Sequence, residues 1–397
     1  MKRALAIAAA VLLSALKAQA QIVDEYTRVE LLAPDTGSAR VTSDVTLAAP
    51  DMLKFTLPIA PDASVTDLSV VDLSTGSSLK ARLTPGGIEV DLPRSSAGSE
   101  SRMRIVYVDT SRSRYRRAGD RVTFTRPLSA RRGSVVLPQG YELTRAGRPA
   151  QILELPDGRI MASFMDSQGA AIDVQARQLK SKPSLVPGST PANAPAPPIA
   201  EAPPRELPLN QIRVAERAIQ DRTIVYFLKE PDTHAFALYH DYTAAREGEH
   251  QYVNVVRTGS SVSEPSAKIL DTGETLKTRT LTGADIAREK IDIPDRVEPE
   301  TQVVLIPFPP VKKGSSLRLR ISETYTDPAR YALVDGQLMW HRSFGRPRND
   351  MVLPAGWYLT TSSMPAVITE DADGRIRLSF WNPRPDSLDV LVRGRRR

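Results

Sequence analysis

Apolar and polar residues alternate with a period of two along most of this chain, and no long stretch repeats apolar residues with the spacing of a helix. The runs 160–164 and 376–380 each place apolar residues on one face. An Asp-Gly pair, typical of a hairpin turn, precedes each run. The pattern therefore predicts an all-β protein built from antiparallel β-sandwiches.

The chain contains an internal repeat. Residues 136–177 align without a gap to residues 352–393, and close to half of the aligned pairs are identical. A second constant spacing relates residues 34–82 to residues 231–279. The sequence therefore predicts two tandem copies of one β-sandwich domain.

A proline-rich segment separates the two repeats. It spans residues 179–208 and contains almost no large apolar residue, which is typical of an extended linker. We therefore expect copy one to span residues 21–178 and copy two to span residues 209–397. Copy two carries an insertion around residues 283–313, and extra loop length is where a repeat can gain contacts of its own.

Residues 1–20 have the pattern of a cleaved secretory signal, in which Lys2 and Arg3 precede an apolar core and small residues precede Gln21. The apolar core is too short to cross a membrane, and no later segment approaches the necessary length, so we expect no membrane span. The chain has no cysteine, which excludes disulfides, thiolate chemistry and a cysteine-linked lipid. The sequence predicts a soluble periplasmic or secreted protein.

The formal net charge of +7 falls to +4 when the three basic residues within 1–20 leave with the signal. An exported protein with this mild charge is not expected to bind nucleic acid. The chain ends in a basic cluster, Arg395, Arg396 and Arg397. Two interpretations stand: a solvated surface or frayed tail, or contact with anionic envelope polymers or lipid headgroups.

Motifs that carry catalysis are missing from the sequence, including H-E-x-x-H, G-x-S-x-G, the Walker loop and G-x-G-x-x-G. His234 and His240 share one face of a predicted strand at a separation too great to bind one metal ion. Asp271 begins a short aspartic-protease-like signature, but copy one offers no second aspartate, and Asp373-Gly374 lacks the further ligands of a calcium loop. We interpret both as turns and expect neither a metal nor a cofactor.

Aromatic residues give the candidate binding site, since all three tryptophans belong to copy two. Trp381 follows the inward Phe380, so alternation turns its side chain outward beside Arg377. Tyr358 is expected to point away from the inward Trp357. Outward rings next to an arginine can stack on a sugar or bind a peptide, although packing under a loop is the alternative. Tyr358, Trp381 and Arg377 are therefore the predicted binding residues.

Copy two also resembles known proteins. The segments A-K-I-L-D-T-G at 267–273 and L-P-A-G-W at 353–357 resemble a domain of secreted bacterial proteins of unknown function. They are similar to the β-sandwich that precedes transglutaminase-like cores and, more faintly, to the amino-terminal β-sandwich of gluzincin aminopeptidases. In those families a following domain carries catalysis, through a Cys-His-Asp set or H-E-x-x-H, and this sequence has neither. The resemblance implies a fold without an inherited activity.

The leading hypothesis is a non-catalytic, exported cell-envelope protein whose tandem domains bind a protein or a glycan. Two weak sites on one chain gain avidity from their effective concentration, which gives the repeat a purpose. One alternative is an extracytoplasmic hydrolase of glycans that uses two acidic side chains about 5 to 10 Å apart. Another is a structural subunit of an envelope complex.

Overall fold

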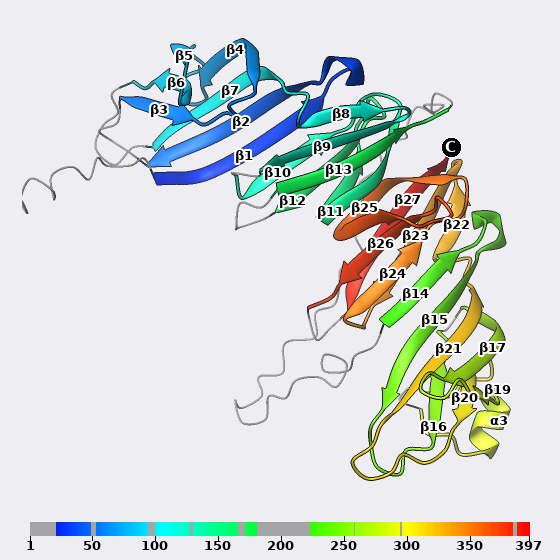
Figure 1. Ribbon diagram of the computed structural model, residues 1–397. Coiled ribbons are helices and arrows are strands. Elements are labelled where there is room, and N and C mark those ends of the chain that lie inside the picture. Colours follow the sequence, from blue (N-terminus) through cyan, green and yellow to red (C-terminus); the bar gives the residue numbers. More distant parts are fainter. Residues whose placement is uncertain are drawn as a thin grey trace, which may run out of the picture. The chain divides into compact units, whose positions relative to one another are not determined.

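The computed structural model describes residues 21–48, 53–93, 100–127, 130–165, 171–180, 223–257, 259–293, 296–383 and 387–397. Nearly all regular elements in these ranges are strands (Figure 1). The exceptions are the short helix α3 (Gly283–Arg288) and the 3-10 turns η1 (Pro34–Thr36) and η3 (Pro231–Thr233). The predicted all-β class is confirmed. The predicted signal, residues 1–20, and the predicted linker beyond Lys180 lie outside the described residues.

The chain divides into two compact units. Unit 1 comprises Met1–Leu143 and Arg159–Gln178, and unit 2 comprises Thr144–Gly158 and Leu179–Arg397. Thr144–Gly158, which the sequence repeat assigns to copy one, belongs to unit 2.

Unit 1 consists of strands and one 3-10 turn. Its strands are β1 (Gln21–Leu31), β2 (Ser38–Ala48), β3 (Lys54–Leu57), β4 (Ser64–Asp72), β5 (Ala81–Thr84), β6 (Gly87–Asp91), β7 (Glu100–Thr110), β8 (Tyr115–Ala118), β9 (Arg121–Pro127), β10 (Arg132–Val136), β12 (Ile160–Met165) and β13 (Ala171–Gln178), together with the start of β11 (Tyr141–Glu154). Strand β1 pairs in parallel with β10 and antiparallel with β2, and β2 continues to β7 and β4. A separate three-stranded sheet has the order β3-β6-β5.

Unit 2 repeats this arrangement. Its strands are β14 (Thr223–Leu228), β15 (Ala235–Ala244), β16 (Gln251–Val255), β17 (Ser261–Ile269), β18 (Thr275–Leu276), β19 (Arg279–Thr282), β20 (Gln302–Pro307), β21 (Leu317–Thr326), β22 (Tyr331–Val334), β23 (Gln337–Phe344), β24 (Arg348–Val352), β25 (Trp357–Glu370), β26 (Ile376–Trp381) and β27 (Leu388–Arg396). Strand β14 pairs in parallel with β24 and antiparallel with β15, and β15 continues to β21 and β17. The separate sheet has the order β16-β20-β19.

The strand registers of the two units match at the offsets seen in the sequence. Val29 pairs with Val135 in unit 1, and the residues at the corresponding positions, Tyr226 and Met351, pair in unit 2. The two Asp-Gly turns also agree, because Gly158 and Gly374 each have a φ of 80°. That left-handed backbone favours glycine and explains why both turns keep it.

The boundary between the units falls within β11. From Thr144 onward this strand belongs to unit 2, where it pairs antiparallel with β25. Ala150 of β11 lies opposite Ala366 of β25, and these two alanines occupy equivalent positions of the sequence repeat.

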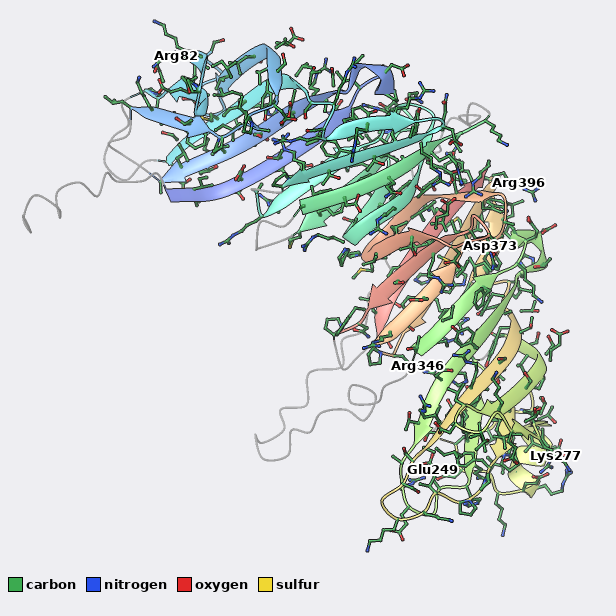
Figure 2. All side chains as sticks on the ribbon, in the orientation of Figure 1. Arg82, Glu249, Lys277, Arg346, Asp373 and Arg396 are labelled. Atoms are coloured by element: carbon green, nitrogen blue, oxygen red, sulfur yellow. The ribbon has the colours of Figure 1, made fainter. Side chains whose placement is uncertain are left out.

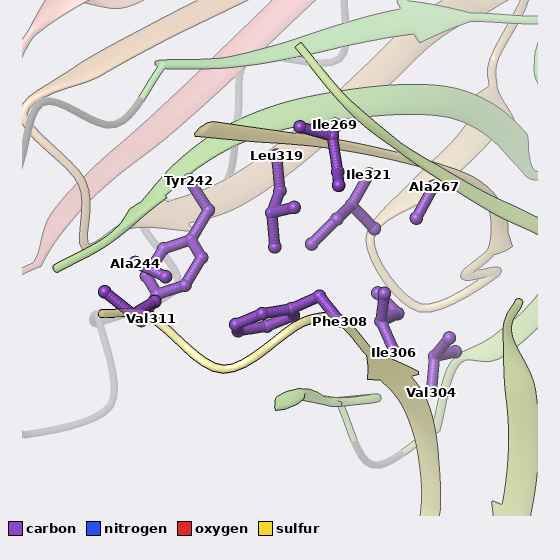
Figure 3. Packing of buried hydrophobic residues seen from close by; sticks show 10 residues of the cluster. All are labelled: Tyr242, Ala244, Ala267, Ile269, Val304, Ile306, Phe308, Val311, Leu319 and Ile321. Carbon is purple, nitrogen blue, oxygen red and sulfur yellow. The ribbon is translucent and has the colours of Figure 1, made fainter. Parts of the chain in front are cut away.

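Two apolar clusters of unit 2 lie on opposite faces of β20. The larger cluster lies between this strand and the sheet of β15, β17 and β21 (Figure 3). It contains Tyr242, Ala244, Ala267, Ile269, Val304, Ile306, Phe308, Val311, Leu319 and Ile321. The smaller cluster joins Val303 and Leu305 to Leu281 and to Ile286 of α3. The insertion of copy two is therefore partly folded into a second core, and its helix was not predicted because six residues carry too little periodicity.

The clusters predict a large effect of Phe308→Ala, because Phe308 is buried in the larger one. Removing a packed ring costs about 3 to 5 kcal/mol of unfolding free energy. Trp381→Ala is the control, since this side chain is 68% exposed and its loss should change the free energy by less than about 0.5 kcal/mol. Calorimetric unfolding of the full-length chain measures both, and equal effects of the two substitutions would contradict this packing.

Candidate functional site

The predicted aromatic surface is only partly present. Trp381 is 68% exposed, as alternation predicts, and the guanidinium carbon of Arg348 lies 6.0 Å from the centre of its ring. Tyr358 is 3% exposed, so the expectation that it points outward is wrong. The first four residues of β25 are all buried, and where both faces of a strand are covered alternation does not separate inside from outside.

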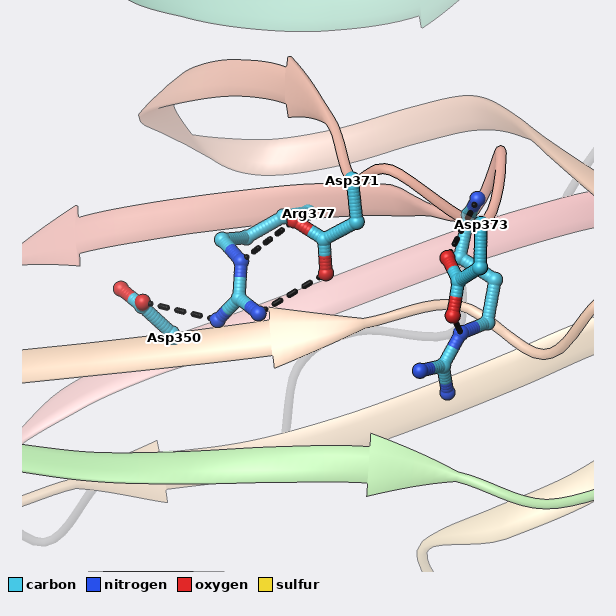
Figure 4. A network of polar contacts seen from close by, with 5 residues as sticks. Asp350, Asp371, Asp373 and Arg377 are labelled. Carbon is cyan, nitrogen blue, oxygen red and sulfur yellow. Dashed lines mark hydrogen bonds and ion pairs between the residues drawn. The ribbon is translucent and has the colours of Figure 1, made fainter.

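Arg377 is held by carboxylates (Figure 4). Its Nε and Nη2 atoms donate to the two oxygens of Asp371 at 2.9 and 2.8 Å, and Nη1 donates to Asp350 at 3.1 Å. The bond to Asp371 raises the pKa of the Arg377 guanidinium above its ordinary value. In the neighbouring turn Asp373 accepts bonds from the backbone and side chain of Arg375. The acids that resemble a calcium loop in the sequence are thus engaged by arginines.

The carboxy-terminal arginines do not form a free tail. Arg395 donates to Glu154 at 3.0 Å with its side chain only 13% exposed, and Arg396 donates to Glu230 at 2.7 Å. Arg397 donates to the carbonyl oxygen of Gly374 at 3.0 Å. The expectation of a frayed tail is therefore wrong, because β27 continues to Arg396. Contact with an anionic surface stays a prediction, for which Arg396 is the exposed member.

A polar cavity of about 650 Å³ lies within unit 2. We call it the copy-two cavity. It is lined by Ile224, Tyr226, Leu238, His240, Tyr252, Val253, Asn254, Val255, Val256, Arg257, Arg296, Thr301, Glu323, Tyr325, Arg330, Arg342, Ser343, Gly345, Arg346 and Asn349. These residues come mainly from β14, β15, β16, β21 and β23.

Strand β21 supplies both the apolar core and the polar floor of the cavity. Its inward row begins with Leu319 and Ile321, which belong to the larger apolar cluster, and continues with Glu323 and Tyr325. The neighbouring strand β15 adds His240, which is 1% exposed and pairs in register with Ile321. Every second residue of β21 faces inward, and this inward row changes from apolar to polar side chains at Glu323.

Positive charge is concentrated in this cavity. Five of its lining residues are arginines, and Glu323 is the one acidic residue among the described residues that line it. Burial lowers the pKa of the Arg257 guanidinium, and the positive charges of Arg342 and Arg330 lower it further. Like charges are held together here at a cost in free energy that an anion would relieve.

Two of the arginines share a buried counter-ion. Arg330 and Arg342 place Nη1 atoms 3.4 and 3.6 Å from Asp327, whose side chain is 0% exposed. Ser260 donates a further hydrogen bond to Asp327 at 2.9 Å. The guanidinium carbon of Arg342 also lies 4.9 Å from the centre of the Phe236 ring, a cation–π geometry. This cluster holds two positive charges inside the unit.

Glu323 is the buried acid of the cavity and is 3% exposed. Its Oε2 accepts a hydrogen bond from Asn254 Nδ2 at 2.7 Å, and the same amide lies 3.0 Å from the hydroxyl of Tyr325. Its Oε1 is buried and has no hydrogen-bond partner among the described residues. Burial raises the pKa of Glu323, and only partial compensation comes from Asn254, Tyr325 and Arg346.

Arg346 lies between β23 and β24 and is labelled in Figure 2. Its Nη2 donates to the hydroxyl of Tyr252 at 3.3 Å, whereas its buried Nη1 has no hydrogen-bond partner within the described part of the chain. Asn349 Nδ2 donates to the Arg346 carbonyl oxygen at 2.7 Å and holds this turn in place. Leaving a buried donor unsatisfied costs about 1 to 3 kcal/mol.

Copy one has an ion cluster with the same two arginine positions but a different acid, because Asp109 lies two positions before the residue that aligns with Asp327. Arg330 and Arg342 correspond to Arg114 and Arg126, whose Nη1 atoms lie 3.6 and 3.8 Å from Asp109. Burial raises the pKa of Asp109, and the two arginines oppose that rise. Because both copies have a cluster of this kind, it serves the fold and does not by itself indicate a ligand.

The remaining polar residues are specific to copy two. At the sequence offsets, Arg257, Arg346, Asn254 and Tyr252 correspond to Ala60, Ala130, Leu57 and Phe55. All four copy-one residues are buried apolar side chains. The same backbone position is therefore core in one repeat and polar cavity in the other.

The sequence pattern carried a signal for this site that the aromatic hypothesis did not use. An arginine or asparagine in copy two that aligns with an apolar residue in copy one marks a position where packing no longer determines the residue type. The distance along the chain from Arg257 to Arg346 hides that they line one cavity. Arg257 follows β16 and Arg346 precedes β24, and only the tertiary structure brings these two segments to one cavity.

The described residues contain neither a cluster of metal ligands nor a long apolar helix. Within those ranges no group of three or more His, Asp or Glu side chains is arranged to hold a metal ion. No helix in the same ranges is long and apolar enough to cross a membrane.

Comparisons with known proteins give limited information. No family model and no curated protein matches the chain. Structural matches include the M1 zinc metallopeptidase of Deinococcus radiodurans bound to a Tyr-Ser-Ala substrate, with 13% identity and a TM-score of 0.30 over 41% of this chain and 43% of that one. The same peptidase in another crystal structure matches with 14% identity and a TM-score of 0.30 over 40% and 42%.

The chain thus spans less than half of the length of these peptidases. These matches are zinc peptidases, the class to which the gluzincin aminopeptidases of the sequence resemblance belong. The structures named above include no transglutaminase. At these TM-scores the similarity supports no conclusion about activity.

The raised pKa of Glu323 gives a pH-dependent prediction. An acid whose pKa is raised by folding contributes stability below its ordinary pKa, and this contribution is lost as the pH rises through the raised value. Glutamine stays neutral, so Glu323→Gln does not lose this stability as the pH rises. At about pH 8 we therefore expect the variant to melt a few degrees above the unmodified chain, and near about pH 4 we expect no difference.

The control is Asp271→Asn, because hydrogen bonds from Arg318 lower the pKa of Asp271. Its effect should have the opposite sign, a small loss of stability above the ordinary pKa of the acid. Melting curves across this pH range measure both variants. If the stability of Glu323→Gln relative to the unmodified chain falls as the pH rises, the raised pKa of Glu323 is contradicted.

Proposed function

We propose that this chain is a non-catalytic, exported cell-envelope protein that binds a protein or glycan partner, and that the copy-two cavity is its binding site. The observation that carries the proposal is a cavity in which buried polar atoms of Glu323 and Arg346 have no hydrogen-bond partner among the described residues. Pockets of about 300 to 1,000 Å³ with a few convergent polar groups are the usual sites of ligand binding.

The proposed architecture is a tandem duplication of one β-sandwich, with the proline-rich segment 179–208 as the spacer. The matched registers of β1 with β10 and of β14 with β24 support the duplication. The basic and apolar composition of residues 1–20 supports export to the periplasm or the medium. In this proposal copy two recognises the partner and copy one supports it.

Binding is favoured over glycan hydrolysis by the acids of the cavity. Hydrolysis of a glycosidic bond uses two carboxyl groups on opposite sides of the reacting bond. Glu323 is the one acid among the described lining residues. Asp327, the nearby acid, is held by Arg330, Arg342 and Ser260. This arrangement suits the holding of a charged group better than acid and base catalysis.

The test is to fill the cavity without changing its charge. Ser343 lines it from β23, and Ser343→Trp introduces an indole into the space. We expect native mass spectrometry of the full-length chain, incubated with a soluble extract of envelope glycans and peptides, to show a retained small ligand that this variant loses. Retention should fall by about tenfold or more.

The control is Trp381→Ala, which removes the exposed ring of the surface predicted from the sequence. Retention that survives this change but not Ser343→Trp assigns binding to the cavity. If Trp381→Ala loses the ligand and Ser343→Trp keeps it, binding occurs at the aromatic surface around Trp381, and the proposal is contradicted. A melting temperature recorded for each variant separates binding from unfolding.

A further inference from the structure

We propose that the ligand of the copy-two cavity is a sugar carrying an oxyanion, either a carboxylate or a phosphate. Arg257 and Arg346 bind the charge, and Glu323 and Asn254 bind hydroxyl groups of the ring. This inference rests on the proposed function, in which the cavity is the binding site.

Charge is the first step of the argument. Arg330 and Arg342 share the carboxylate of Asp327, and Arg296 lies 3.1 Å from Glu298. These three arginines therefore already face acids of the protein. A ligand anion is not needed to keep them in place.

Arg257 and Arg346 differ, because no ion pair joins either guanidinium to an acid in the described ranges of the chain. Arg346 donates a hydrogen bond to the neutral hydroxyl of Tyr252 through Nη2. At Arg257 the positive charges of Arg342 and Arg330 outweigh the negative charge of Asp327. A guanidinium is a planar fork that matches carboxylate and phosphate oxygens. A ligand oxyanion would supply the missing counter-charge at these two residues.

Hydroxyl recognition is assigned to Glu323 and Asn254. Glu323 is 3% exposed and has one oxygen without a hydrogen-bond partner among the described residues. Asn254 is bonded to its other oxygen, so the carboxyl group is fixed in orientation. A hydroxyl group can both donate and accept, which makes it a suitable partner for a fixed carboxyl oxygen and a neighbouring amide.

Size and wall composition favour a single ring. The rings of Tyr226, Tyr252 and Tyr325 line the cavity and present apolar faces with polar tips. A volume of about 650 Å³ accommodates one small cyclic molecule or the terminal unit of a glycan. Within the partner classes of the proposed function, an acidic glycan end fits this space better than a folded protein surface.

The experiment measures calorimetric binding of four probes to the full-length chain: glucuronate, glucose 6-phosphate, glucose and acetate. We expect at least one of the two anionic sugars to bind about 10- to 100-fold more tightly than glucose and acetate. Arg257→Ala and Arg346→Ala should each remove most of this preference. Copy one carries alanine at both corresponding positions, Ala60 and Ala130, so the fold tolerates the substitutions.

Arg288→Ala is the matched control, because it removes one positive charge from α3, outside the lining of the cavity. It should leave binding unchanged. A stronger response to glucuronate assigns a carboxylate, and a stronger response to glucose 6-phosphate assigns a phosphate. Glucose or acetate binding as tightly as both anionic sugars would overturn the inference, as would unchanged binding in both cavity variants.

The two proposals fail in different ways. If no probe binds, but Ser343→Trp still abolishes retention of an envelope ligand, the sugar oxyanion is wrong and the cavity remains the binding site. If Ser343→Trp retains the envelope ligand, the proposed function is wrong as well.

Discussion

The buried carboxylate of Asp327 lies between Arg330 and Arg342, and the polar interior of unit 2 depends on it. A buried charge without a partner is strongly destabilising, whereas a carboxylate shared by two guanidinium groups and a hydroxyl offsets much of that cost. Copy one has a similar cluster around Asp109, so buried charge of this kind occurs in both copies. The cavity adds Arg257 and Arg346, and neither guanidinium forms an ion pair with an acid among the described residues.

Strand β21 connects this polar region to the stability of the unit. Leu319 and Ile321 are fully buried against β20, and Glu323 and Tyr325 continue the same row into the cavity. Close packing of the apolar half therefore restricts movement of the polar half, since both lie on one strand. A site built on a paired strand is more precisely positioned than a site on a loop. This explains how a buried acid can be held at a fixed place beside several arginines.

The differences between the copies are concentrated in copy two. Its insertion adds the helix α3 and a second apolar cluster around Ile286, and its cavity replaces apolar residues of copy one by polar ones. Such replacements lower stability unless the polar groups are satisfied, and in the proposed function a bound ligand satisfies them. The repeated fold supplies a stable frame in which one copy can accept that cost.

The sequence by itself determined the all-β class, the internal repeat and the Asp-Gly hairpins, because alternation and turn chemistry are local properties that each strand expresses in its own residues. It also placed Trp381 outward correctly. Tyr358 was misplaced because strand β25 is covered on both faces at that point, which no local pattern reveals. The cavity was decided by the tertiary structure alone: Arg257, Glu323 and Arg346 come from distant segments, and only strand pairing determines which buried polar groups meet.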